Sequence, residues 1–221
     1  MPSYGFAAIN DSGVVSIDSE YARLSVLVSG RYSGSGQSVT VTFPAPIATQ
    51  EPPLIFVRPD NNNATVVIGC SLGGTPGNWT SFTVIGQTGY SPAGKYFIGG
   101  FMASPKAHYG FRLWDGSGTL IFDSGTTSAV FSRFFQNWTY VMSTQGAQGF
   151  YTNWYSSPFN PSTDEYLMIN NATMRMLAGD NVGRTCGITF DFARSELWFT
   201  TSALSNPIAF MLPAVFAKIV A

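Results

Sequence analysis

A short stretch of this chain occurs twice, and the repeat constrains the fold more than any other feature of the sequence. The first copy runs from Tyr4-Gly5-Phe6 to Asp18-Ser19, and the second runs from Tyr109-Gly110-Phe111 to Asp123-Ser124, 105 positions later. Seven of the seventeen aligned positions that begin at these tyrosines are identical, without a gap. In each copy, β-branched or aromatic residues flank a polar turn ending in Ser-Gly, which is typical of a β-hairpin. We therefore expect two similar units, each opening with a Tyr-Gly-Phe hairpin.

The rest of the chain supports a division into two units. After the second hairpin, Tyr166-Leu167-Met168-Ile169 matches Leu54 to Val57, and Phe210-Met211 resembles Phe101-Met102. A repeat at about half the length of a 221-residue chain favours two domains. We place the boundary between residues 105 and 106, which gives one unit over residues 1–105 and another over residues 106–221.

Both units contain short segments with the pattern of β-strands. Ser38 to Phe43 alternates in polarity, and Ile188 to Phe192 and Leu197 to Thr201 lie on either side of a polar turn. No stretch shows a sustained period of 3.6 residues. The sequence therefore predicts an all-β fold of two tandem antiparallel β-sandwich-like units.

The chain carries unusually few charges. Charged residues make up 10% of it, against about 25% in ordinary soluble domains. The three lysines stand beside eight arginines, ten tyrosines and eighteen phenylalanines, and protein interfaces are likewise rich in aromatic residues and Arg and poor in Lys. We expect a homo-oligomer, with much of the surface covered by other subunits. The alternative is a large core in a β protein of low charge.

Charge and hydropathy also bear on partners and location. A net charge of −1 offers no basic surface for nucleic acid. The amino terminus lacks a basic, apolar leader, and the apolar run from Ile208 to Ala217 is interrupted by Pro213, so we expect neither secretion nor a membrane span. We expect synthesis in a cytoplasm, where Cys70 and Cys186 would be buried thiols, although a disulfide between them is possible.

Residues with catalytic or metal-binding chemistry do not form a convincing set. Gly69 to Gly73 fits the G-x-S-x-G pattern around Ser71, but the only histidine is His108, and no acid lies between these two residues. One histidine and two separated cysteines are too few for a zinc site. The Asp and Asn clusters lack the spacing of a calcium loop. We expect no enzyme activity, no metal and no cofactor.

One aromatic run is a candidate for binding. Residues 150–155 combine aromatic rings with hydrogen-bonding groups in what reads as a loop, and such residues stack on sugars or anchor protein interfaces. The candidate site residues are Tyr151, Asn153, Trp154 and Tyr155. Three roles remain open for them: contact with another subunit, cover for the core, or contact with a ligand or host surface.

The repeated hairpin also resembles a known protein family. Tyr-Gly-Phe, a polar turn with Ser-Gly and a closing Asp-Ser are similar to the opening of small structural proteins at the distal tail of tailed bacteriophages, described as tail-tip, baseplate or tail-fibre components. The resemblance covers some 35 of the 221 residues. It implies a non-enzymatic virion protein built of β-domains and made in the host cytoplasm. With the composition, it leads us to expect a tail protein that assembles with itself and with other tail proteins and contributes to host attachment. The alternative is a β-sandwich module that binds a carbohydrate or a receptor, such as a host surface polysaccharide.

Overall fold

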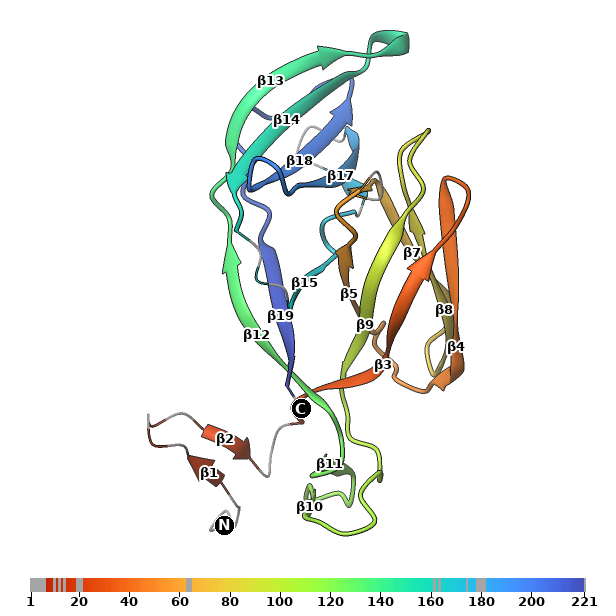
Figure 1. Ribbon diagram of the computed structural model, residues 1–221, viewed down its shortest axis with the longest axis vertical. Coiled ribbons are helices and arrows are strands. Elements are labelled where there is room, and N and C mark those ends of the chain that lie inside the picture. The colour runs from red at the N-terminus through yellow and green to blue at the C-terminus, as the bar shows by residue number, and fades with distance from the viewer. Residues whose placement is uncertain are drawn as a thin grey trace.

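The computed structural model of the protein describes residues 7–9, 11, 13, 15–18, 22–62, 65–160, 162, 164–173, 175–177 and 182–220 (Figure 1). Strands account for 59% of the structure. The described residues form no α-helix, only one 3-10 turn, η1 (Ala147–Gly149). None of the helical structure in this part of the chain could therefore span a membrane. The all-β prediction is confirmed.

The two predicted hairpins are present and have the same register. β1 (Ala7–Ile9) pairs with β2 (Val15–Asp18), and β10 (Arg112–Trp114) pairs with β11 (Leu120–Asp123). Ala7 lies opposite Asp18 and Arg112 lies opposite Asp123, and both hairpins carry a bulge after the second pair. The pairing thus repeats with the 105-residue offset of the sequence. The first Tyr-Gly-Phe, at residues 4–6, lies outside the described residues.

Six strands close a barrel, and each unit contributes three adjacent strands (Figure 1). Their spatial order is β12 (Ser128–Phe135), β19 (Ala214–Val220), β15 (Glu165–Met168), β5 (Leu54–Pro59), β9 (Ala93–Phe101) and β3 (Leu24–Ser33). A bulge separates Val26 from Val28 in β3, and another separates Phe131 from Arg133 in β12, again with an offset of 105 residues. Within each unit, the strands follow the same order around the barrel: β3, β9 and β5 in the first unit correspond to β12, β19 and β15 in the second. An approximate twofold axis therefore relates the two halves of the barrel.

Strand pairing tests the predicted matches between the units. Tyr166 lies opposite Ala217, and Leu54 lies opposite Gly99. Ala217 and Gly99 occupy equivalent places, because each also pairs with the residue at the start of the bulge in its unit, Phe131 in β12 and Val26 in β3. The match of residues 166–169 with residues 54–57 is therefore confirmed.

The expected likeness of Phe210-Met211 to Phe101-Met102 is wrong. Phe101 pairs with Leu24 in β3, and the equivalent residue Ile219 pairs with Ala129 in β12. Phe210 instead precedes β19 in a segment without strand structure. Two residue types alone do not define register, because Phe and Met suit many buried positions.

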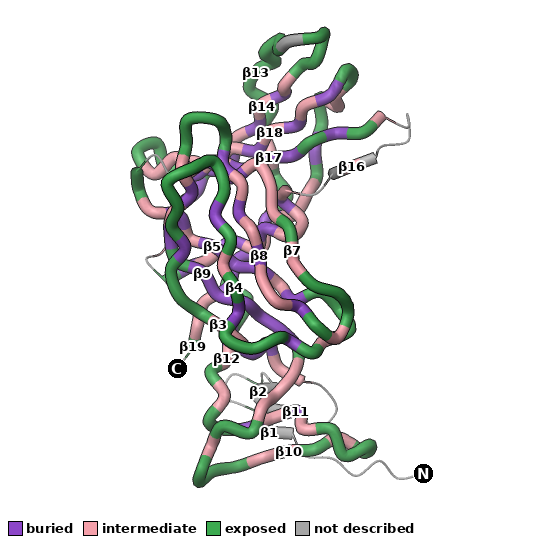
Figure 2. Tube along the Cα trace, turned by 90° about the vertical axis from the view of Figure 1, so that its right-hand side faces the viewer, coloured by how far each residue is buried: buried purple, intermediate pink, exposed green. Residues whose placement is uncertain are grey.

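Each unit adds an outer sheet to its half of the barrel. The first sheet has the order β4 (Ser38–Ile47), β8 (Asn78–Ile85) and β7 (Gly69–Thr75). The second has the order β13 (Thr139–Gln145), β14 (Tyr151–Pro158), β18 (Glu196–Ala203), β17 (Gly183–Asp191) and β16 (Arg175–Leu177), and β6 (Val66–Val67) also pairs with β17. Figure 2 shows both sheets beside the barrel.

Side chains alternate between two apolar layers along the barrel strands. Phe56 and Phe97 stack with ring centroids 4.4 Å apart, in a cluster drawn from five barrel strands, which places them in the barrel interior. Their neighbours Ile55 and Ile98 face the outer sheets. All four side chains are fully buried, and each such burial contributes about 1.5–3 kcal/mol. Each unit is therefore a sandwich of barrel wall and outer sheet, as predicted, and the two walls join edge to edge.

The predicted boundary falls in a segment without strand structure, residues 102–111, between β9 and β10. Across this boundary, Val57 of β5 lies opposite Leu167 of β15, and Ser25 of β3 lies opposite Ser128 of β12. The division between residues 105 and 106 therefore stays a prediction. It separates two repeat units, but strands of both units form the one closed barrel.

Candidate functional site

The four predicted site residues lie on β14, and the strand directs them to opposite faces. Asn153 and Tyr155 point inward, with 4% and 0% of their surface exposed. Trp154, between them, is half-buried on the outer face, and Tyr151 is 42% exposed at the start of the strand. This alternation is the period of two that a strand imposes. Only Trp154 and Tyr151 are therefore available to a ligand.

Asn153 and Tyr155 fasten a loop to the inner face of the sheet. Asn153 Nδ2 donates a hydrogen bond to the Pro207 carbonyl oxygen at 2.8 Å, and the Tyr155 hydroxyl donates to the same oxygen. Ser143 in turn donates to Asn153 Oδ1. The Tyr155 ring lies 5.4 Å from that of Phe210, between centroids. These two candidates thus serve the interior, one of the three roles left open by the sequence.

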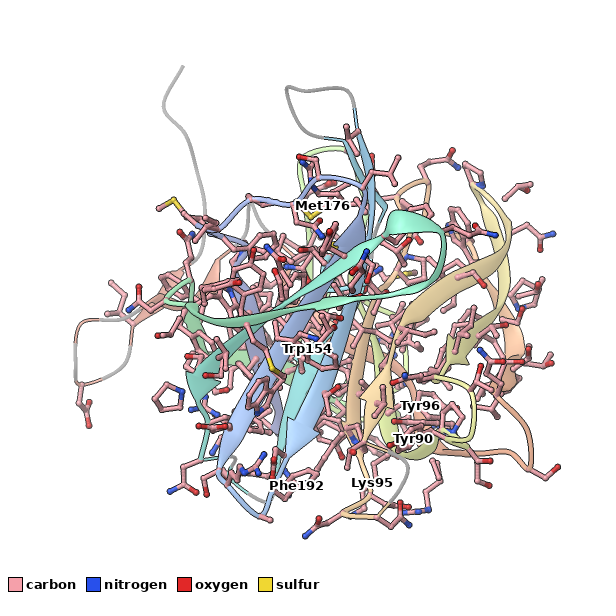
Figure 3. All side chains as sticks on the ribbon, turned by 90° about the horizontal axis from the view of Figure 1, so that it is seen from above. Tyr90, Lys95, Tyr96, Trp154, Met176 and Phe192 are labelled. Atoms are coloured by element: carbon pink, nitrogen blue, oxygen red, sulfur yellow. The ribbon has the colours of Figure 1, made fainter. Side chains whose placement is uncertain are left out.

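Trp154 forms an aromatic pair with a residue that the sequence did not single out for binding. Its ring lies 6.3 Å from the ring of Trp198 on β18, with an angle of 71° between the planes. Trp154 Nε1 donates to Thr144 Oγ1 at 2.9 Å, which fixes the orientation of this indole. Figure 3 shows Trp154 near the middle of the second outer sheet.

The two tryptophans line a shallow groove of about 220 Å³ on the outer face of this sheet. At its rim, Arg194 donates from its backbone N–H to Asp191 Oδ1 at 2.9 Å, and its guanidinium lies 3.5 Å from the other carboxylate oxygen. The lining residues come from β13, β14, β17, β18 and the turn after β17: Met142, Trp154, Thr189, Asp191, Arg194 and Trp198. Leu197, Trp198 and Phe199 form an apolar run in the sequence. Only the tryptophan of the three faces outward, and the sequence alone gives no sign of this.

The second hairpin explains why its motif has these residues. Gly110 has φ = +152°, and a Cβ built on it would lie 2.1 Å from Ser124 Oγ. Ser124 Oγ accepts a hydrogen bond from the Phe111 N–H at 3.0 Å, and the Ser124 N–H donates to the Phe111 carbonyl at 2.9 Å. Glycine and serine are therefore required where the hairpin closes.

Asp123 organises the base of the same hairpin. Its carboxylate, 1% exposed, accepts hydrogen bonds from Arg112 Nε at 2.6 Å, from the Gly125 N–H at 2.8 Å and from the Ala107 N–H at 3.1 Å. Desolvation alone would raise the pKa of Asp123, but these donors outweigh it and hold the pKa below its usual value. The closing Asp-Ser pair of the motif thus has a structural role.

Tyr109 has no such role. It is 97% exposed, and Phe111 and Trp114 beside it are 44% and 54% exposed. Figure 2 shows the β10–β11 hairpin projecting from the barrel. The first residue of the motif therefore contributes an aromatic side chain to the surface and almost nothing to the core.

Ser71 does not occupy a nucleophile elbow. It lies within β7, opposite Thr83 of β8, whereas an elbow needs a turn from strand to helix. His108 lies outside β7, in the segment that leads into β10. Figure 1 shows the β10–β11 hairpin below the barrel and β7 in the sheet beside it. No three potential metal ligands cluster within the described residues. Cys70 and Cys186 are free thiols, as the sequence predicted; Cys186 is buried as expected, whereas Cys70 is only partly buried.

No family model, no curated protein and no solved structure matches this chain.

Proposed function

We propose that the protein is a non-enzymatic structural component of a bacteriophage tail end, at the tip, baseplate or fibre. It assembles with copies of itself and with neighbouring tail proteins, and it contributes to host attachment. The observation that carries this proposal is the 97% exposure of Tyr109. In the second copy of the motif, Gly110, Asp123 and Ser124 have roles in the fold, whereas this tyrosine has none. An exposed aromatic anchor is what an interface uses.

Further aromatic side chains extend the surface available for assembly. On β12, Phe131 is 50% exposed and Phe134 is 75% exposed. Burying such rings against a partner removes apolar surface from water, which is the main favourable term in association. The low overall charge agrees with this use of the surface.

The edge of the second outer sheet is also open. All seven residues of β13 are exposed, and among the described residues this strand pairs only with β14. Exposed edges invite pairing with another chain, and closed assemblies remove them. An assembly function accounts for this edge, whereas a monomer would leave it as an aggregation hazard.

A variant of the exposed tyrosine tests the proposal. Tyr109→Ser should weaken self-association of the full chain by about 30-fold or more, the effect of losing one central interface residue. Tyr90→Ser is the matched control, because Tyr90 is 38% exposed and lies away from the hairpin, near Tyr96 in Figure 3. Sedimentation of the two variants gives the dissociation constants. Equal constants for Tyr109→Ser and the unchanged protein would contradict a role of this hairpin in assembly.

A further inference from the structure

We infer that the groove between Trp154 and Trp198 binds a neutral carbohydrate chain, one sugar ring at a time. This inference concerns a surface other than the hairpin and does not depend on the proposed assembly. It rests on the shape of the groove, on its two indole rings and on the charge balance of its rim.

The two indoles form a platform with two orientations. At 71° to each other and 6.3 Å apart, they offer one ring as a floor and one as a wall. Sugar rings have apolar C–H faces that pack on aromatic surfaces, and tryptophan combines a large apolar area with low conformational freedom. The hydrogen bond from Trp154 to Thr144 holds the Trp154 indole in place before a ligand arrives.

The rim supplies the polar groups that sugar hydroxyls need. Asp191 can accept a hydrogen bond from a hydroxyl, and Arg194, 71% exposed at its side chain, has guanidinium donors left for hydroxyl oxygens. Thr189 adds a hydroxyl from the neighbouring strand. Each hydroxyl of a sugar is both a hydrogen-bond donor and an acceptor. One sugar ring can therefore donate to Asp191 and accept from Arg194 at the same time.

Charge and size narrow the ligand further. Among the described residues that line the groove, Asp191 is the one acid and Arg194 the one base, and they are paired with each other. This described lining therefore offers no net charge for a phosphate or a carboxylate. Its volume of about 220 Å³ lies below the range of about 300–1,000 Å³ of pockets that enclose a whole drug-sized ligand. A groove of this size suits a single sugar ring, with the rest of the oligosaccharide extending outside it.

A glycan array of neutral and acidic oligosaccharides, probed with the full chain, tests the inference. We expect retention on at least one neutral glycan. Titration of that oligosaccharide in solution should then show a change in tryptophan fluorescence. Trp154→Ala should weaken binding at least tenfold, whereas Trp114→Ala, which removes an exposed tryptophan of the hairpin, should leave the affinity unchanged.

The exposed Arg194 provides a second variant in case Trp154→Ala does not fold. Arg194→Ala should weaken binding several-fold while leaving the circular dichroism spectrum unchanged. Light scattering on the same samples separates the two proposals, because loss of glycan binding should leave the oligomeric mass intact.

No retention on the array, retention of acidic glycans alone, or equal affinity in the Trp154 and Trp114 variants would overturn the inference. A groove that accommodates a protein partner would also give no retention.

Discussion

Gly110 and Ser124 fit together only because residue 110 lacks a side chain: a Cβ there would lie 2.1 Å from Ser124 Oγ. We therefore expect Gly110→Ala to destabilise the hairpin by about 1–3 kcal/mol, the usual cost of a strained backbone with a clash. Hydrogen exchange of the Phe111 amide, which donates to Ser124, measures this locally.

Gly116 in the same hairpin is the control for that substitution. A Cβ at Gly116 meets no atom within 4 Å, so Gly116→Ala should leave the exchange rate of the Phe111 amide nearly unchanged. Equal effects of the two substitutions would show that glycine flexibility, and not the contact with Ser124, explains the motif.

The inward-facing hydroxyl of β14 allows a second prediction. Tyr155→Phe removes the hydrogen bond to the Pro207 carbonyl and should lower the free energy of unfolding by about 0.5–1.5 kcal/mol. Tyr151→Phe, at an exposed position of the same strand, should change it by less than about 0.5 kcal/mol. Urea denaturation compares the two, and a larger loss in the Tyr151 variant would contradict the stabilising role of the buried Tyr155 hydroxyl.

The ion pair between Arg133 and Glu165 should matter more than a surface pair. Arg133 Nη2 lies 3.0 Å from Glu165 Oε2, with 8% of the glutamate side chain exposed, and the guanidinium lies 4.6 Å from the centroid of the Phe216 ring. Arg133→Ala should cost about 2–3 kcal/mol, somewhat less than for a fully buried pair, because the arginine side chain is 31% exposed.

The comparison for this prediction is the pair of Arg31 with Asp60, whose side chains are 56% and 31% exposed. Arg31→Ala should cost about 0–1 kcal/mol. Unfolding in urea measures both free energies. If the Arg31 variant were the less stable of the two, burial would not be the factor that decides the strength of these pairs.

The thiols make a prediction about pH. Burial raises the pKa of Cys70 and of Cys186 to about 12, so at pH 8 very little of either thiol is ionised, against about a quarter in an unfolded chain. Ellman's reagent should therefore react with the native protein far more slowly than with the unfolded protein. Rapid reaction of the native protein would contradict the raised pKa of these thiols.

The same pKa shifts make stability fall in alkali. The folded chain keeps the thiol protons at pH values where the unfolded chain releases them. This contribution to stability is complete below about pH 8.5 and is lost as the pH rises towards about 12. Burial raises the pKa of Tyr32 as well and adds to the same trend. Urea midpoints at several alkaline pH values should decrease, and less steeply in a Cys70→Ala, Cys186→Ala variant.

The sequence predicted the features that depend on local pattern. The repeat from Tyr4 and Tyr109 predicted both hairpins, and the match of residues 166–169 with residues 54–57 predicted two equivalent strands, one in each unit. The sequence did not predict that the barrel closes. The pairing of β5 with β15 joins residues about 110 positions apart, so it leaves no local signature in the sequence.

The candidate site was predicted only in part, for the same reason. The aromatic run on β14 was visible, but which of its residues point outward depends on the strand boundary and on the neighbouring strand. Trp154 has Trp198 as a neighbour because Ser156 lies opposite Trp198 in the register of β14 and β18. That register is a property of the whole sheet, and neither segment specifies it alone.

The most direct test of the proposed assembly function is the absolute mass of the full chain in solution, measured by light scattering over a range of protein and salt concentrations. We predict a defined multiple of 23.8 kDa that persists on dilution. A stable monomer at every concentration would contradict the account, and the exposed aromatic residues of the hairpin and of β12 would then need another explanation.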